Sequence, residues 1–206
     1  MKTPSFIALI IGISFIGNAQ PVIELYESGG EKARGEMSDG LKTGEWLYFY
    51  PSGIPNSIEN YKKGILHGKV TYFYPTGKMQ GQEQWNNGSI TDSAYYYHEN
   101  GKLDKKGVYL NSSYEGKWIH YFTNGSIERT LYYKNGLPEG PTLVYDEAGV
   151  LVQEGEYHLG KEHGLWKFYT EDGKLQYKGN YENGEPVGVW YSSKKGKEKV
   201  YKRYKN

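Results

Sequence analysis

Cysteine is absent from this 206-residue chain, and methionine occurs only three times. Without cysteine the chain has no disulfide framework, no cysteine-based zinc site and no thiol nucleophile. An excess of one charge is also lacking, because 25 basic residues face 24 acidic ones and leave a formal net charge of +1. The chain as a whole therefore does not attract nucleic acid, and we expect no nucleic-acid partner. When glycine is counted as apolar and tyrosine is left out, the apolar share is about 40%, below the usual 45–50%, which disfavours a large aliphatic core.

Sequence signals for helices and for catalytic sites are missing as well. After residue 20 no stretch with a 3.6-residue hydrophobic period is long enough for a helix. No Gly-x-Gly-x-x-Gly phosphate loop leads into a helix, and the serines and threonines have no nucleophile-elbow context. The five histidines lack partners at the spacing of metal ligands. We therefore expect no enzymatic activity, no cofactor and no metal site.

The first twenty residues differ from the rest of the chain. Lys2 precedes an apolar run, Phe6–Ile16, which is followed by Gly17–Ala19. A basic start, a short apolar segment and small residues before a cleavage point are typical of a secretory signal peptide. The run is also too short to span a bilayer comfortably. We expect a signal peptide over residues 1–19, cleavage after Ala19, and export to the periplasm, the outer membrane or the extracellular space. The alternative is an N-terminal helix that is buried or anchors the chain.

Tyrosine and glycine are abundant, with 22 and 28 residues. Aromatic residues reach 16% of the chain, which is too many for a disordered segment. They recur in a 24-residue repeat, of which Gly44–His67 and Gly68–Thr91 are two successive units. The units start at residues 20, 44, 68, 92, 116, 140, 164 and 188. We expect one repeat domain over residues 20–206.

The glycines fall in three columns of this repeat and mark turns. One column begins most units, and another contains the pairs Asn87-Gly88, Asn135-Gly136 and Asn183-Gly184. Asn-Gly favours positive φ and forms tight hairpin turns. Asp92 breaks the first column and Ser112 breaks the other. The columns therefore divide the chain into short segments joined by tight turns.

Between the turns lie short runs dense in aromatic residues, such as Trp46–Tyr50, Trp118–Phe122 and Trp166–Tyr169. Aromatic residues favour strands, so each unit is predicted to be a two-stranded hairpin. A single hairpin cannot bury its own face, and neighbouring hairpins must stack. We predict an all-β fold of tandem 24-residue hairpins stacked into an elongated antiparallel sheet.

Equivalent residues of successive units should form ladders that supply the core. Two such columns are Phe49, Phe73, Tyr97, Tyr121, Tyr145 and Tyr169, and Met79, Leu103, Ile127, Leu151 and Leu175. A further column is aromatic in nearly every unit, and its Tyr133 is expected to be buried against Tyr109 and Tyr157. Tryptophan is missing from its column at Val70, Ala94 and Thr142.

Two segments, Tyr157–Trp166 and Tyr181–Trp190, carry the pattern Tyr-x-x-Gly-x-x-x-Gly-x-Trp. This pattern resembles the MORN repeat, and at a period of 24 it is similar to the bacterial MORN repeat variant, also seen in YwqK-like antitoxins. The resemblance covers essentially all of residues 20–206. It implies antiparallel hairpins stacked into a long twisted sheet, and it does not by itself imply one function.

The densest aromatic cluster comprises Tyr95, Tyr96, Tyr97 and Tyr109. Successive residues of a strand face opposite sides, so Tyr96 must face away from its two neighbours. Part of the cluster should therefore be exposed unless a partner covers it. With Trp118, these tyrosines form our candidate binding surface for a peptide or glycan, because Tyr and Trp suit interfaces. The alternative is that the aromatic columns are core.

The C-terminal segment is strongly basic. Its cations are Lys194, Lys195, Lys197, Lys199, Lys202 and Arg203. Lysines on the last strand can blunt an exposed sheet edge. The other interpretation is that they contact an anionic surface such as membrane lipid, lipopolysaccharide or an acidic protein.

These observations lead to two functional hypotheses. The first is an exported, monomeric, non-enzymatic repeat scaffold that binds a protein or extended ligand through its aromatic sheet. The second, implied by the YwqK-like resemblance, is an antitoxin or immunity protein that neutralises a toxin.

Overall fold

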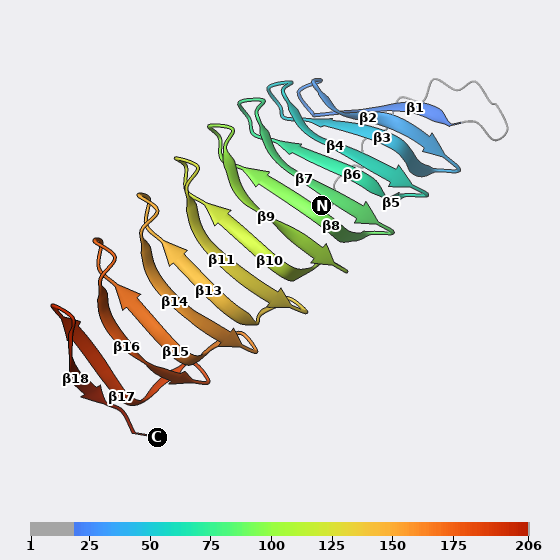
Figure 1. Cartoon of the computed structure of the whole chain (residues 1–206). Coiled ribbons are helices and arrows are strands. Elements are labelled where there is room, and N and C mark those ends of the chain that lie inside the picture. The colour runs from blue at the N-terminus through green and yellow to red at the C-terminus, as the bar shows by residue number, and fades with distance from the viewer. Residues whose placement is uncertain (1–18, 206) are drawn as a thin grey trace, which may run out of the picture. The chain divides into compact units, whose positions relative to one another are not determined.

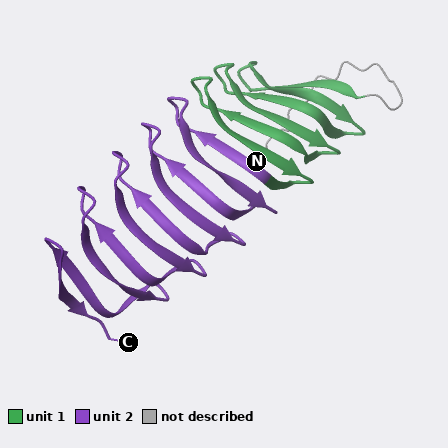
Figure 2. Ribbon diagram, viewed as in Figure 1, with its two compact units in different colours: residues 1–91 green, residues 92–206 purple. Residues whose placement is uncertain are grey.

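The computed structural model describes residues 19–205 and contains two compact units, which meet in the sequence between Thr91 and Asp92 (Figure 2). The division falls where one 24-residue repeat ends and the next begins. The predicted signal peptide covers residues 1–19, of which residues 1–18 lie outside the described part.

The described residues form strands and turns and contain no helix. The strands of unit 1 are β1 (Gln20–Leu25), β2 (Glu31–Ser38), β3 (Leu41–Phe49), β4 (Pro55–Lys62), β5 (Ile65–Leu66), β6 (Gly68–Phe73) and β7 (Met79–Asn86). Strand β8 (Ser89–Tyr97) begins in unit 1 and continues into unit 2.

Unit 2 continues the same pattern of hairpins. Its further strands are β9 (Leu103–Leu110), β10 (Ser113–Tyr121), β11 (Ile127–Lys134), β12 (Leu137–Pro138), β13 (Gly140–Tyr145), β14 (Leu151–His158), β15 (Lys161–Tyr169), β16 (Leu175–Glu182), β17 (Glu185–Lys194) and β18 (Lys197–Arg203). Within each unit, strands that follow one another in the sequence lie side by side and pair antiparallel (Figure 1). The prediction of an all-β fold of tandem hairpins in an antiparallel sheet is confirmed.

The tight turns have the backbone conformation that the glycine columns predict. Asn135 and Gly136 both have positive φ, 52° and 81°, as a two-residue type I′ turn requires. Ser112, which replaces a glycine of this column, also adopts a positive φ of 63°, and Asp92 in the first column has 61°. Both substitutions therefore keep the conformation of the glycine at the cost of some steric strain.

The core consists of tryptophan rings that lie over glycines on the preceding strand. Trp46, Trp118 and Trp166 are almost fully buried, and Trp190 is 6% exposed. A Cβ atom on the glycine eleven residues earlier would lie only 2.2–2.4 Å from the nearest ring atom in each case, which is closer than two non-bonded carbon atoms can approach. These four pairs are Gly35 with Trp46, Gly107 with Trp118, Gly155 with Trp166 and Gly179 with Trp190. We call the side of the sheet that carries these rings the tryptophan face, and the other side the opposite face.

Repeats without tryptophan fill the same place differently. Val70, Ala94 and Thr142 occupy the position of the ring and are buried. The position eleven residues earlier then carries a side chain in place of glycine: Glu59, Glu83 and Leu131, respectively. Glu83, which is 8% exposed, accepts hydrogen bonds from the Tyr72 hydroxyl (3.1 Å) and from Trp85 Nε1 (3.0 Å). The pKa of Tyr72 is raised, mainly because its hydroxyl is buried and also because the Glu83 carboxylate lies beside it.

Two expectations about the core are wrong. Met79 and Ile127, taken as members of a core ladder, are each 39% exposed. They pair with the last residue of the preceding strand at a register shift, which moves this column to the rim of the sheet. Tyr133 is only half-buried, and its ring packs on Tyr114, at a centroid distance of 5.0 Å, which the sequence grid did not identify as its neighbour.

A column of polar side chains joins successive repeats at their longer turns. The Tyr26 hydroxyl donates to the Phe49 carbonyl (2.6 Å), and the Tyr50 hydroxyl donates to the Phe73 carbonyl (2.8 Å). His98 Nε2 makes the equivalent contact with the Tyr121 carbonyl at 2.8 Å. Each bond links residues 23 positions apart, and therefore ties a repeat to the next one.

The tryptophan–glycine pairs predict a specific sensitivity to a single methyl group. Gly107→Ala should lower the free energy of unfolding by about 1–3 kcal/mol, because the new methyl group overpacks against the buried Trp118 ring. Gly30→Ala is the matched control, since its nearest neighbour would be Ser28 Oγ at 3.9 Å, and it should change stability by less than about 0.5 kcal/mol. Urea melts of both variants beside the parent test the difference. Equal midpoints for the two variants would contradict this packing.

Candidate binding surfaces

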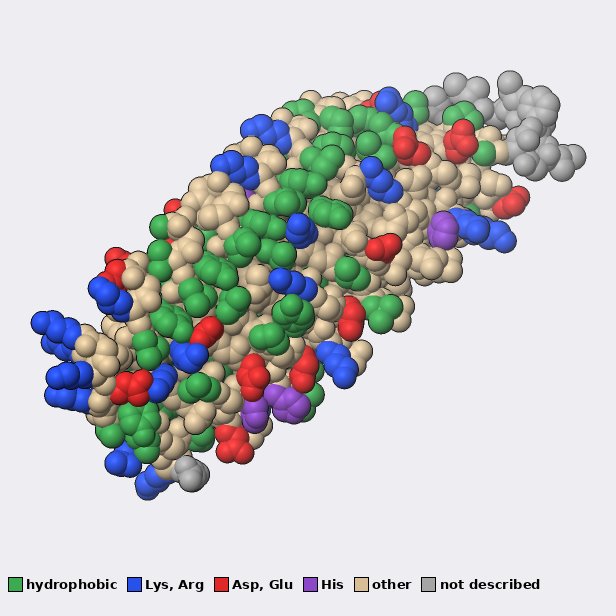
Figure 3. Space-filling model, viewed as in Figure 1, with side chains coloured by type: hydrophobic (Ala, Val, Ile, Leu, Met, Phe, Trp, Pro, Cys, Tyr) green, Lys and Arg blue, Asp and Glu red, His purple; other side chains and the backbone are tan. Residues whose placement is uncertain are grey.

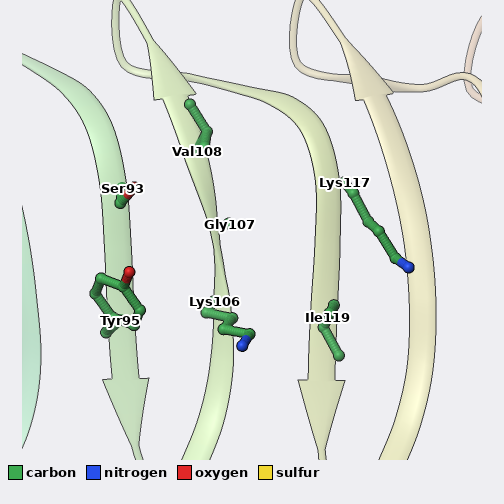
Figure 4. Close-up of a pocket in the computed structure, with 7 residues that line it drawn as sticks. All are labelled: Ser93, Tyr95, Lys106, Gly107, Val108, Lys117 and Ile119. Carbon is green, nitrogen blue, oxygen red and sulfur yellow. The ribbon is translucent and has the colours of Figure 1, made fainter.

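A shallow hollow of about 230 Å³ lies on the opposite face of unit 2 (Figure 4). It is lined by Ser93, Tyr95, Lys106, Gly107, Val108, Lys117 and Ile119. Tyr95 and Val108 are 38% and 41% exposed. We call this site the Tyr95 groove. It combines exposed apolar surface with two lysines.

The three consecutive tyrosines of the predicted surface are divided between the two faces. Tyr95 lies in the Tyr95 groove, whereas Tyr96 lies on the tryptophan face, where its hydroxyl is 3.2 Å from that of Tyr109. Tyr97 is half-buried at the end of β8, where it pairs with Leu103. The cluster is therefore not one continuous surface.

Two of the predicted surface residues belong to the core. Trp118 is fully buried, and Tyr109 is 8% exposed. Both pack with Tyr114, whose ring centroid is 4.3 Å from that of Trp118 and 5.0 Å from that of Tyr109. Because a partner cannot reach side chains covered in this way, the candidate surface has to be redrawn without these two residues.

The basic C-terminal residues lie on β17, β18 and the turn between them, and all are exposed. They are Lys194, Lys195, Lys197, Lys199, Lys202 and Arg203. Blue side chains accordingly gather around the C-terminal strands in the space-filling view (Figure 3). The carboxylate of Glu198 is bound by Lys178 at 2.7 Å, so it does not neutralise the tail lysines directly.

An aromatic hollow of about 270 Å³ adjoins these strands. It is lined by Phe168, Tyr177, Tyr181, Trp190, Tyr201 and Tyr204. Lys202 Nζ lies 4.5 Å from the centre of the Tyr204 ring, and Tyr201 is 56% exposed. The sequence interpretation noted the lysines of this segment but not its aromatic residues.

Three basic side chains occupy neighbouring strands on the tryptophan face of unit 2. In the sheet register His120 on β10 pairs with Lys105 on β9 and with Arg129 on β11. We call Lys105, His120 and Arg129 the basic row. Burial lowers the pKa of His120, and the positive charges of Arg129 and Lys105 lower it further.

The sequence interpretation missed the basic row and the lysines of the Tyr95 groove. The repeat grid places Lys105 and Arg129 in one column, but it does not show that His120 lies between them, nor that Lys106 and Lys117 line one hollow. Identifying them requires the pairing register, which shifts by a bulge between Glu115 and Ile119 in the β9–β10 pair. A signal was nevertheless present, because small residues such as Ala33 and Ser57 occupy the column in which Lys105 and Arg129 stand.

Residues 19–205 hold no cluster of three or more His, Asp or Glu side chains able to coordinate a metal ion. Nor do they include a helix with the length and apolar character needed to cross a membrane.

Comparison with known families identifies the repeat. The model of the MORN repeat variant matches residues 42–63, 66–87, 93–111, 114–135, 138–158 and 162–183. These segments make up more than half of the chain. The protein therefore belongs to the MORN repeat variant family, as the sequence pattern predicted, and is a repeat scaffold.

Other comparisons add little. No curated protein sequence matches the chain significantly. Among solved structures, the chain is similar to one described as TcdB2-TccC3-Cdc42, with 10% identity and a TM-score of 0.20, covering 86% of this chain and 13% of that one. A second, TcdB2-TccC3, gives 10% identity and a TM-score of 0.20, with 85% and 14% coverage. This chain thus spans only a small part of either, and likenesses at this level carry no argument about function.

The environment of His120 predicts how stability depends on pH. Above its ordinary pKa of 6.5, His120 is neutral in both the folded and the unfolded chain and contributes no pH dependence. As the pH falls below this value, the unfolded chain takes up a proton first, so stability decreases until the lowered folded-state pKa is passed. His120→Gln should remove this loss, which thermal melts of both proteins between about pH 7.5 and pH 5 would reveal. Parallel pH profiles would contradict this assignment.

Proposed function

We propose that this protein is a non-enzymatic scaffold that binds a protein or another extended ligand through the Tyr95 groove. The observation that carries the proposal is the exposure of Tyr95 and Val108, which lie two positions apart on the paired strands β8 and β9, in a hollow on the opposite face. The buried rings on the other face already stabilise the fold, so packing does not require apolar residues here. Exposed tyrosines in a shallow hollow are typical of interfaces.

The charges around the hollow indicate how a ligand would be oriented. Lys106 Nζ lies 5.9 Å from the centre of the Tyr121 ring, and Lys117 Nζ lies 6.0 Å from that of Tyr132. Each ammonium group is therefore within reach of an aromatic ring, with Lys106 on the strand next to Tyr95 and Lys117 on the far side of the hollow (Figure 4). A ligand with an apolar group at Tyr95 and acidic groups extending toward β9 and β10 would complement this arrangement (Figure 4).

Export is part of the proposal and rests on the basic start, apolar segment and small residues of positions 1–19. N-terminal sequencing of the protein from its native host should give Gln20 as the first residue. An intact Met1 in the mature protein would contradict export by cleavage.

The alternative is an antitoxin or immunity role, which differs from the first proposal in that the bound partner is a toxin. A toxin encoded next to this protein that is inactivated when the two are mixed would favour it. In that case the toxin itself is the ligand of the scaffold, and the same surface can be tested with it.

Site-directed photo-crosslinking tests the surface directly. A benzoyl-phenylalanine residue at position 95 should crosslink a specific partner in the native host, whereas one at Leu165, exposed on another strand of unit 2, should not. With the identified partner purified, Tyr95→Ala should weaken binding by a factor of about 30, the effect of losing one interface hot spot. Leu165→Ala should bind like the parent. Equal crosslinking at both positions, or an unchanged affinity of Tyr95→Ala, would refute the proposed surface.

A further inference from the structure

The basic row places two cations on the strands that flank His120. Like charges directly opposite each other on adjacent strands destabilise a sheet, so a proton on His120 would meet a cation on each side. In unit 1 the corresponding column holds Ala33 and Ser57, which are fully buried and carry no charge. Unit 2 therefore places Lys105 and Arg129 where unit 1 has the small residues Ala33, Ser57 and Gly81, on either side of His120.

Neighbouring carboxylates neutralise the row only in part. Glu128 pairs with Arg129 at 3.3 Å, and Asp104 pairs with His98 at 3.7 Å. Lys105 donates to the Tyr114 hydroxyl at 3.3 Å and lies 4.7 Å from the centre of the Tyr96 ring. The same charged groups act on His120. Asp104 and Glu128 raise its pKa, but burial and the two cations together lower it by more.

We propose that the basic row binds an acidic, extended segment of a protein partner, and that binding strengthens when His120 takes up a proton. The inference goes beyond the proposed function, because the row lies on the tryptophan face and the Tyr95 groove lies on the other. Carboxylates beside His120 favour its charged form, so binding and protonation support each other by linkage.

The spacing of the row suits an extended acidic chain. Adjacent strands are about 4.8 Å apart, so the row spans about 10 Å across β9, β10 and β11. In an extended segment, side chains that point to the same side are about 6.8 Å apart, so two carboxylates of such a segment can lie along the row. Neither hollow described above includes a residue of the row, and Arg129 is exposed. A flat, open site of this kind fits a protein segment better than a small molecule.

The test uses a labelled decapeptide of alternating Glu and Ser, with a Gln–Ser peptide of the same length as control. Fluorescence anisotropy with the full chain should show binding about threefold tighter or more at about pH 5.5 than at pH 7.5. The glutamates of the peptide remain largely ionised over this range. A change of affinity with pH therefore reports on a histidine.

Variants assign the effect to the row. His120→Gln should abolish the pH dependence, and Arg129→Gln should weaken binding at both pH values. Lys161→Gln, an exposed lysine elsewhere in unit 2, should behave like the parent. pH dependence that persists in His120→Gln, or binding lost only when the C-terminal lysines are replaced, would overturn the proposal. Binding to vesicles containing phosphatidylserine but not to the peptide would overturn it in favour of a lipid surface.

Discussion

The packing of one indole ring on one glycine is the contact on which this structure depends. A two-stranded hairpin has too little surface to bury a core of its own. In the repeats that contain Trp46, Trp118, Trp166 or Trp190, the ring covers a glycine of the preceding strand, where a methyl group has no room. In three of the four pairs the indole nitrogen also donates to a nearby carbonyl: Glu36, Val108 and Asn180. The hydrophobic contact therefore joins consecutive strands and fixes their spacing.

Because this contact is confined to one face and to nearest neighbours, other positions are free to vary. Repeats with Val70, Ala94 or Thr142 replace the glycine with a larger side chain and keep the site filled. The opposite face of unit 2 can then expose Tyr95, and the rim of the tryptophan face can hold Lys105, His120 and Arg129. A scaffold of equivalent hairpins can thus carry different surfaces in different repeats, which is how repeat proteins diversify their binding.

The amino-acid sequence was sufficient to predict the repeat, the turns and the strands, because glycine columns and aromatic runs are local signals. It also located the tryptophan column, including its three gaps. It did not reveal that Gly107 and Trp118 touch, since that contact depends on the register between two strands. The same limit explains the errors at Met79, Tyr109 and Trp118: a column shows which residues are equivalent, but not how far each is exposed. The basic row joins residues of three strands and was missed for the same reason.

The most direct test of the tryptophan–glycine contact is a double-mutant cycle at Gly155 and Trp166. Trp166 Nε1 has no hydrogen-bond partner, so this pair isolates ring packing from the loss of a hydrogen bond. Gly155→Leu and Trp166→Thr should each destabilise unit 2 strongly, while the double variant recreates the combination found at Leu131 and Thr142. We predict that the double variant loses less free energy of unfolding than the sum of the two single losses, by about 1–3 kcal/mol in urea melts. Additive effects would contradict the claim that ring and glycine form one packing unit.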